Sequence, residues 1–423
     1  MNRKTSNEPE VMLGFAARCV RPASLAQFLP DRIHLLSSFL AHRNTVVDIA
    51  CKERPVESYA GDDKARQTIE LKFGDFVDFY QASFAGRPHW LLDVDDLDFY
   101  LCQCPVAVFK PDATCSAPTL PSVMDDFVIP ECLRDQPLSQ VNLWMSTRAG
   151  RTGLHYDAYQ NVLVVLFGQK VVTMYPPSET AHLYPFPVHL KSANHSNVSV
   201  DHPDMTRHPK FAQAKAQRFV VGAGDALFIP EGWWHQVDSD AYTIAANYWW
   251  EGTRVQLTKD PGMTAYYARV MMEELIKQQT DTFIEDLRSA SQASPQCASL
   301  PLDVIDEIVR IFCDTHNREE REKMVLSLEP LTTLRAFQTV LAKEHQAEWR
   351  ALLRDSSMEL AAILAACWDQ TVDDAEFQST IFSALGDEEE SIKLSLVAKR
   401  EQFQRKMCAT VCQSVLGIEK DCL

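Results

Sequence analysis

The sequence predicts an all-β jelly-roll core with an N-terminal α/β flank and a C-terminal all-α region. Three observations support this division. From Val141 to Trp250, short runs of β-forming residues alternate with Gly and Pro, a pattern typical of a jelly roll or barrel. After about Asp260 only 3 of the 14 glycines remain, and apolar residues recur at helical spacing. Before Pro130, strand-like runs surround one helical pattern.

The N-terminal region, residues 1–130, is predicted to pack on the barrel as a flank. Thr45–Ala50 and Val106–Lys110 are rich in β-forming residues and predict strands. Phe73–Ala82 carries four aromatic residues at helical spacing. We therefore expect a helix there, with its aromatic stripe buried in the core.

The central region, residues 131–255, is predicted to form the jelly roll itself. Its short strands are separated by turns that contain Gly or Pro. A further strand is expected to begin near His235, after the Pro230–Gly232 turn. The other expected strands are Val141–Met145, Asn161–Leu166, Lys170–Tyr175, Arg218–Val221, Ala226–Ile229 and Thr243–Trp249.

The C-terminal region, residues 256–423, is predicted to be helical. From Pro261 onward it has 17 basic and 28 acidic residues, a balance of −11 within the net −17 of the whole chain. Three roles remain open for it: a homodimer interface, a partner-binding surface, or a cap on the barrel. Its expected helices are Tyr266–Leu287, Leu302–Phe312, Leu352–Trp368 and Ile392–Val415.

Charge and hydropathy limit the cellular compartments and the classes of partner that we expect for this protein. The net charge of −17 repels phosphate backbones, so a nucleic-acid substrate needs a local basic patch such as Arg148 with Arg151. The polar start of the chain lacks a secretory pattern, and no apolar run reaches the roughly 18 residues of a membrane span. We expect an intracellular protein, in the nucleus, the cytoplasm or both, without a membrane partner.

The chemistry is concentrated around two histidines and one aspartate. His155 and Asp157 are two residues apart, so in an extended strand both side chains project from the same face. His235 begins another expected strand, which a rolled sandwich can place beside the first. Two imidazoles and one carboxylate occupy one face of an octahedron and leave three positions open. This donor set suits Fe(II) that must also bind a cosubstrate and O2.

The tripeptide His155–Asp157, of the form His-x-Asp, is by itself weak support for a metal site, because a second His-x-Asp occurs at His202–Asp204. That copy lies in a polar stretch and contains Pro203, which cannot complete a strand ladder, so we interpret it as a loop. The first copy leads directly into an apolar strand, which is the context that a buried site requires.

Three polar residues surround the first copy at informative distances. Thr152 precedes His155 by three residues, and Asn161 and Lys170 follow it. A dicarboxylate cosubstrate chelates the metal at its 2-oxo acid end and needs a cation and a hydroxyl for its distal carboxylate. Lys170 and Thr152 can supply both.

From Leu143 to Trp250 the sequence resembles the JmjC-type cupin, or double-stranded β-helix, of the Fe(II)- and 2-oxoglutarate-dependent oxygenases. It is most similar to the JmjC-only group, which includes the asparaginyl hydroxylase, the small-heat-shock-protein-associated protein and the plant JmjC-only proteins. Four motifs carry the resemblance: His155–Asp157, Met174–Pro177, Gly224–Pro230 and Asn247–Trp249.

The resemblance implies roles for nine residues and a set of cofactors. Its metal ligands correspond to His155, Asp157 and His235, and its cofactors are Fe(II), 2-oxoglutarate as cosubstrate and O2. The remaining correspondences are Lys170, Thr152 and Tyr100 for the distal carboxylate, Asn161 and Asn247 for the cosubstrate pocket, and Trp249 for an aromatic wall near the iron.

The implied reaction is hydroxylation of a protein side chain, or demethylation through hydroxylation, with succinate and CO2 as coproducts. A protein substrate is preferred over tRNA. The alternatives are hydroxylation of a modified tRNA base and a catalytically silent interaction scaffold. A homodimer through the C-terminal helices is a further expectation.

Overall fold

The computed structural model describes residues 8–419 except 57, 60–66, 95, 111–116, 189, 191, 292–300, 330 and 372–373. The chain divides into two compact units. The first contains Met1–Thr264 together with Ser414–Ile418, and the second contains Ala265–Gln413 together with Glu419–Leu423. The region boundaries expected at 130 and 255 stay predictions.

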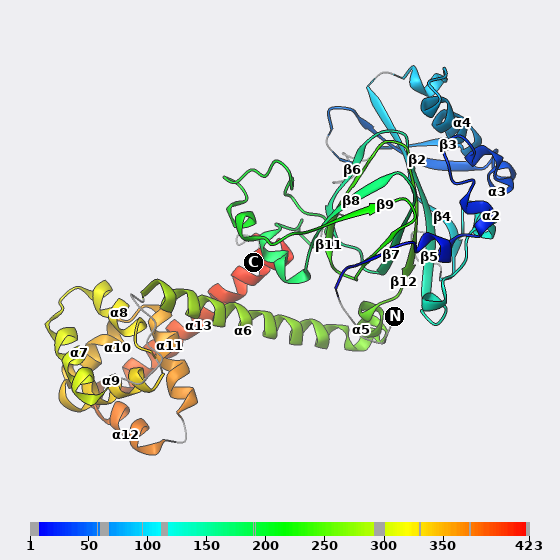
Figure 1. Cartoon of the computed structure of the whole chain (residues 1–423). Helices are drawn as coiled ribbons and strands as arrows, with labels where there is room; N and C mark the ends of the chain where they lie inside the picture. Colours follow the sequence, from blue (N-terminus) through cyan, green and yellow to red (C-terminus); the bar gives the residue numbers. More distant parts are fainter. Residues whose placement is uncertain are drawn as a thin grey trace. The chain divides into compact units, whose positions relative to one another are not determined.

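The first unit is built on two antiparallel sheets (Figure 1). The larger sheet has the order β1-β10-β7-β12-β5-β4-β2-β3, and the smaller has the order β6-β11-β8-β9. Strands of the larger sheet are β1 (Glu10–Met12), β10 (Ala226–Ile229), β7 (Gln160–Phe167), β12 (Thr243–Trp250), β5 (Leu138–Ser146), β4 (Leu97–Val108), β2 (Val46–Glu53) and β3 (Gln67–Lys72). Strands of the smaller sheet are β6 (Gly150–His155), β11 (Trp234–Ser239), β8 (Gln169–Tyr175) and β9 (Gln217–Gly222).

The two sheets share an apolar core, which confirms the predicted double-stranded β-helix. Val165 of β7 and Ala245 of β12 belong to the same buried cluster as Val172 of β8 and Val221 of β9. Because neighbouring residues of a strand point to opposite faces, every second residue of β7 and β12 faces the smaller sheet. This alternation directs polar side chains of the same strands into the interior of the barrel.

The N-terminal flank covers the outer face of the larger sheet. Phe73 begins the expected helix, α4 (Phe73–Phe84), in which Phe73, Phe76, Phe79 and Tyr80 are buried and only the last aromatic residue, Phe84, is exposed. The four buried rings join a cluster that includes Tyr248 and Ala246, two of the residues of β12 that face away from the barrel interior. Both faces of β12 are therefore covered, and all eight of its residues are buried. The remaining short helices of this unit are α1 (Ala16–Cys19), α2 (Pro22–Leu25), α3 (Ser37–Ala41) and α5 (Thr253–Thr258).

The second unit is an all-α bundle with its own apolar core, as the sequence predicts. Phe312, Phe337 and Trp349 are fully buried in it. One expectation was wrong: Leu352–Trp368 is divided between two helices rather than forming one. Ser357 caps the second of these, because its hydroxyl accepts a hydrogen bond from Leu360 N at 3.1 Å. The helices are α6 (Thr264–Ser291), α7 (Leu302–Asp314), α8 (Arg318–Leu326), α9 (Leu331–Glu344), α10 (Gln346–Asp355), α11 (Met358–Gln370), α12 (Ala375–Ser383) and α13 (Glu389–Leu416).

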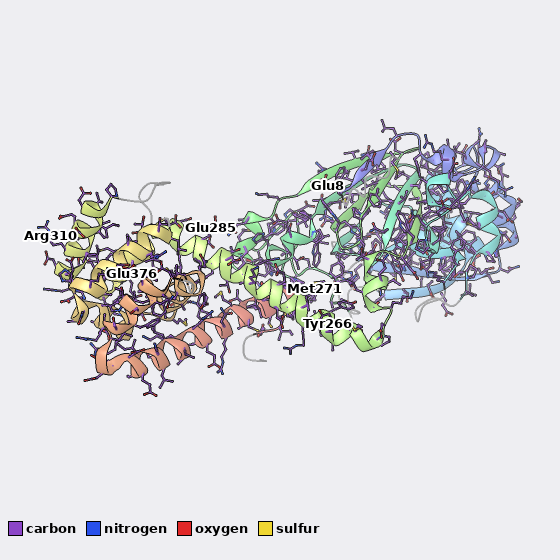
Figure 2. The ribbon with its side chains drawn as sticks, turned by 90° about the horizontal axis from the view of Figure 1, so that it is seen from below. Glu8, Tyr266, Met271, Glu285, Arg310 and Glu376 are labelled. Atoms are coloured by element: carbon purple, nitrogen blue, oxygen red, sulfur yellow. The ribbon has the colours of Figure 1, made fainter. Side chains whose placement is uncertain are left out.

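Helix α6 carries apolar side chains that its own unit does not cover. Tyr266 and Met271 are both more than half exposed, and Figure 2 shows them along this helix. Nothing in the structure identifies a second copy or another partner for them, so a homodimer through the C-terminal helices stays a prediction. No helix in the described part of the chain combines the length and apolar character needed to cross a bilayer.

Candidate metal centre

The two histidines are placed by a pair of neighbouring strands in the smaller sheet. His155 is the last residue of β6, and His235 lies directly opposite it on β11. Opposed residues of an antiparallel pair have closely spaced side chains on the same face. Asp157 is not in the strand, as the same-face argument assumed, but two residues beyond its end. The turn is tied to the start of β11, because Gly232 N donates to Asp157 O at 3.0 Å.

The three side chains converge on one point. The Nε2 atom of His155 is 3.9 Å from one carboxylate oxygen of Asp157, and that of His235 is 3.7 Å from the other. One ligand atom from each of the three residues lies within 4.8 Å of the others, so the group could hold a metal ion. The second tripeptide, His202–Asp204, forms an exposed loop, and Asp204 hydrogen-bonds its own turn at Thr206.

Both imidazoles present the same nitrogen to this point. His155 Nδ1 donates to Gly153 O at 2.8 Å, and His235 Nδ1 donates to Trp233 O at 2.9 Å. These bonds leave the Nε2 lone pairs free to bind a cation, the usual arrangement of metal-binding histidines. Burial, helped by the neighbouring His155, lowers the pKa of His235 to about 4, so this ring is neutral at physiological pH.

A cavity of about 750 Å³ opens beside the group and contains every predicted site residue in its lining. Thr152 and Lys170 come from the smaller sheet, whereas Asn161, Asn247 and Trp249 come from the larger one. Within the described lining, Asp157 is the only acidic side chain and Lys170 the only Lys or Arg.

Lys170 is the most unusual of these residues, because its ammonium group is buried without a counter-ion. The side chain is 2% exposed, its Nζ donates to Ser239 Oγ at 2.6 Å, and it lies 5.9 Å from the ring centroid of Tyr100. The structure records no carboxylate partner for it among the described residues. Burial lowers the pKa of Lys170 to about 8. A buried cation of this kind is stabilised when an anion occupies the cavity.

The two predicted amides belong to a buried hydrogen-bond network. Asn247 Nδ2 donates to Asn161 Oδ1 at 3.2 Å, and Asn247 Oδ1 accepts from Trp144 Nε1 at 2.7 Å. Trp249 stacks on Tyr159 with ring centroids 5.2 Å apart, and its buried Nε1 has no hydrogen-bond partner among the described residues. An unsatisfied donor in the wall of a cavity suits a ligand that carries oxygen acceptors.

Sequence reasoning missed several lining residues. Trp144 lies on β5 and is not part of any motif. Tyr59 lies in the N-terminal flank, outside the jelly roll. His195 and Asn194 come from the long connection between β8 and β9. A single His in a polar stretch carries no spacing signal, so only the fold could place it at the site.

The residues present fit Fe(II) and 2-oxoglutarate. Two imidazoles and one carboxylate form the donor set of non-haem iron oxygenases. Lys170 supplies a buried positive charge to the same cavity, with no carboxylate partner in the described part of the chain, which suits the second carboxylate of a dicarboxylic acid.

Comparison with known proteins agrees with this geometry. Residues 34–254 match the family described as the cupin-like domain. The chain is 30% identical over 270 residues to the lysine-specific demethylase JMJ31 of Arabidopsis thaliana, a match that covers 60% of this chain and 48% of that protein.

Two further relatives carry names of other kinds. The chain is 32% identical over 131 residues to tRNA wybutosine-synthesizing protein 5 of Gallus gallus, covering 31% of this chain and 40% of that protein. It is 36% identical over 112 residues to an HSPB1-associated protein 1 homolog of Danio rerio, covering 26% of this chain and 25% of that protein. The matches span about half or less of the length of these relatives.

Proposed function

Because the chain belongs to the cupin-like JmjC family, we propose that it is an Fe(II)- and 2-oxoglutarate-dependent dioxygenase acting on a protein side chain. The reaction is hydroxylation, or demethylation through hydroxylation, with succinate and CO2 as coproducts. The convergence of His155, Asp157 and His235 beside the buried Lys170 is the observation that carries this proposal.

Each of the predicted site residues has a distinct part in this reaction. His155, Asp157 and His235 would hold the iron, which with 2-oxoglutarate and O2 supplies the oxidising power for C–H hydroxylation. Lys170 would bind the distal carboxylate, with the Thr152 hydroxyl and Tyr100 alongside it. Asn161 and Asn247 would hydrogen-bond the cosubstrate, and Trp249 would exclude water from one side.

The test of this activity is release of succinate. Purified protein supplied with Fe(II) and 2-oxoglutarate is expected to form succinate slowly without a substrate and faster with one. Bound metal and cosubstrate without succinate, in the presence of extracts that contain candidate substrates, would instead support a silent scaffold. Mass spectrometry of protein and RNA from cells lacking the gene identifies the substrate by its missing oxygen or retained methyl group.

Hydroxylation of a modified tRNA base is the second candidate, and the similarity to tRNA wybutosine-synthesizing protein 5 favours it. The ion pairs of two arginines argue against this candidate. Arg148 Nε lies 3.3 Å from Asp98, and Arg151 Nε lies 2.5 Å from Asp238. Both arginines of the expected basic patch are therefore paired with carboxylates, which reduces their attraction for phosphates.

We expect bulk tRNA to bind weakly, with a dissociation constant above about 100 µM at physiological salt. Fluorescence anisotropy with labelled tRNA at two salt concentrations measures this. A phosphate-binding surface gives an affinity that falls steeply as salt rises. Micromolar affinity with such a salt dependence would favour the tRNA candidate over a protein substrate.

A further inference from the structure

We propose that His195 is a positioning residue of the metal centre and that the C-terminal end of α13 clamps the loop that carries it. This inference rests on the proposed function, because it assigns His155 to the metal. It concerns the connection between β8 and β9, residues 176–216, which the chemistry described above does not use.

The loop pairs directly with the strand that carries the first metal ligand. His195 forms an antiparallel bridge with His155. Two backbone hydrogen bonds flank this bridge: Ser196 N donates to Leu154 O at 2.9 Å, and Tyr156 N donates to Asn194 O at 3.0 Å. Residues 194–196 therefore continue the smaller sheet beside the end of β6.

The pairing brings the two imidazole rings into a stack. The ring centroids of His155 and His195 are 5.3 Å apart with an interplanar angle of 19°. His195 is not part of the group of three ligand atoms, so it acts on the metal through His155. Its own ring is held by Asn194, whose Oδ1 accepts from His195 Nδ1 at 3.0 Å and whose Nδ2 donates to Tyr156 O at 2.8 Å.

This stack has a defined mechanical effect on His155. The hydrogen bond from His155 Nδ1 to Gly153 O fixes one edge of the ring but leaves it able to tilt about that bond. A flat ring packed nearly parallel to it removes this freedom. His155 Nε2 is thereby kept directed at Asp157 before a cation binds, which lowers the ordering cost of metal binding.

The loop is also held by the C-terminal end of α13 and the glycine that follows it. Phe186 N donates to His195 O at 2.8 Å, and Val188 N donates to Leu416 O at 3.0 Å. Gly417 follows with φ of +66°, and a Cβ built on it would lie 2.9 Å from Pro185 O and from Pro187 N and Cα. Only glycine fits this approach, since all three neighbours are backbone atoms. Leu416 and Gly417 belong to the same compact unit as the loop.

Metal affinity tests the positioning role without relying on turnover. Full-length protein is titrated with Co(II), whose visible absorption reports binding. His195→Ala is expected to weaken Co(II) binding by about three- to tenfold, the range of a stacked aromatic pair. His195→Phe, which keeps a flat ring and loses both nitrogens, is expected to stay within about twofold of the wild type. Equal affinity of His195→Ala and wild type would overturn the proposal.

Two glycine variants test the clamp. Gly417→Ala and Gly86→Ala impose almost the same backbone strain, at φ of +66° and +62°, but nothing lies within 4 Å of a Cβ at Gly86. Gly417→Ala is expected to speed amide exchange of Phe186 and Val188 and to weaken Co(II) binding, whereas Gly86→Ala does neither. Identical exchange in this loop for both variants would overturn the clamp.

The two levels of inference fail separately. Wild-type protein that binds neither Co(II) nor Fe(II) would remove the proposed function and this inference together. Wild-type protein that binds metal and releases succinate, with His195→Ala unchanged in Co(II) affinity, would remove only the role of His195.

Discussion

Asp157→Ala is expected to abolish both metal binding and succinate release while the fold is retained. Asp157 supplies the only carboxylate of the three-residue group, and it faces both imidazoles at 3.7 and 3.9 Å. Its loss leaves only two imidazole nitrogens to hold a divalent cation. Because changes even in residues behind metal ligands cost about 10- to 100-fold in affinity, loss of a ligand is expected to exceed about 100-fold.

The chain contains a matched control for this variant. Asp204 occupies the same position in the second His-x-Asp tripeptide but lies in an exposed loop. Asp204→Ala is expected to leave Co(II) titration and succinate release unchanged. Thermal unfolding of both variants checks that the fold persists. If Asp157→Ala retained Co(II) affinity, the assigned ligand set would be wrong, whatever the activity.

The sequence alone could predict the placement of the residues that lie on paired strands. His155 and His235 were expected to meet because both were placed in extended strands that a rolled sandwich can set side by side, and the smaller sheet pairs β6 with β11 directly. Lys170 was expected near His155 because it begins the next expected strand after the turn at Gly168; in the structure it is the second residue of β8 and lines the cavity. Such predictions succeed because the two-residue period of a strand fixes the face on which each side chain lies.

The remaining parts of the site depend on contacts that no local pattern encodes. Asp157 reaches the other ligands from a turn whose path is set by its backbone bond to Gly232. His195 arrives through a connection of some forty residues, and its position depends on pairing with His155 and on backbone contacts at Gly417. The break between α10 and α11 was missed because apolar residues recur on both sides of Ser356 and Ser357, so the pattern looks continuous. The two serines end one helix and cap the next.

Lys170→Met is expected to raise the 2-oxoglutarate concentration needed for half-saturation by about 10- to 150-fold, the range of a hydrogen bond to a charged group. Metal binding is expected to persist, because Lys170 is not one of the three ligands. Methionine fills a similar volume in the buried site without the positive charge. Lys110→Met is the control, since Lys110 is an exposed residue paired with Glu251.

The pH dependence of cosubstrate binding gives an independent readout of the same residue. With a pKa of about 8, Lys170 is protonated below that pH and loses its charge above it. The wild-type affinity for 2-oxoglutarate is therefore expected to be constant from pH 6.5 to 7.5, and then to fall towards about tenfold per pH unit. Lys170→Met is expected to show no such fall.

The stability of the ligand-free fold should rise with pH over the range in which the affinity for 2-oxoglutarate falls. The unfolded chain holds the proton of Lys170 up to the ordinary pKa of 10.5, whereas the ligand-free fold releases it near pH 8. Because the unfolded state binds more protons between these values, this group makes the ligand-free fold more stable as pH rises through that window. A bound dicarboxylate raises the pKa of Lys170 and reduces the effect.

Calorimetry distinguishes this mechanism from a general loss of structure at high pH. Above pH 8, binding of 2-oxoglutarate to wild-type protein requires Lys170 to take up a proton, so the measured heat should change with the ionisation enthalpy of the buffer. Lys170→Met should bind 2-oxoglutarate with the same heat in two buffers of different ionisation enthalpy. Buffer-dependent heat that persists in this variant would assign the proton to another group and move the carboxylate site away from Lys170.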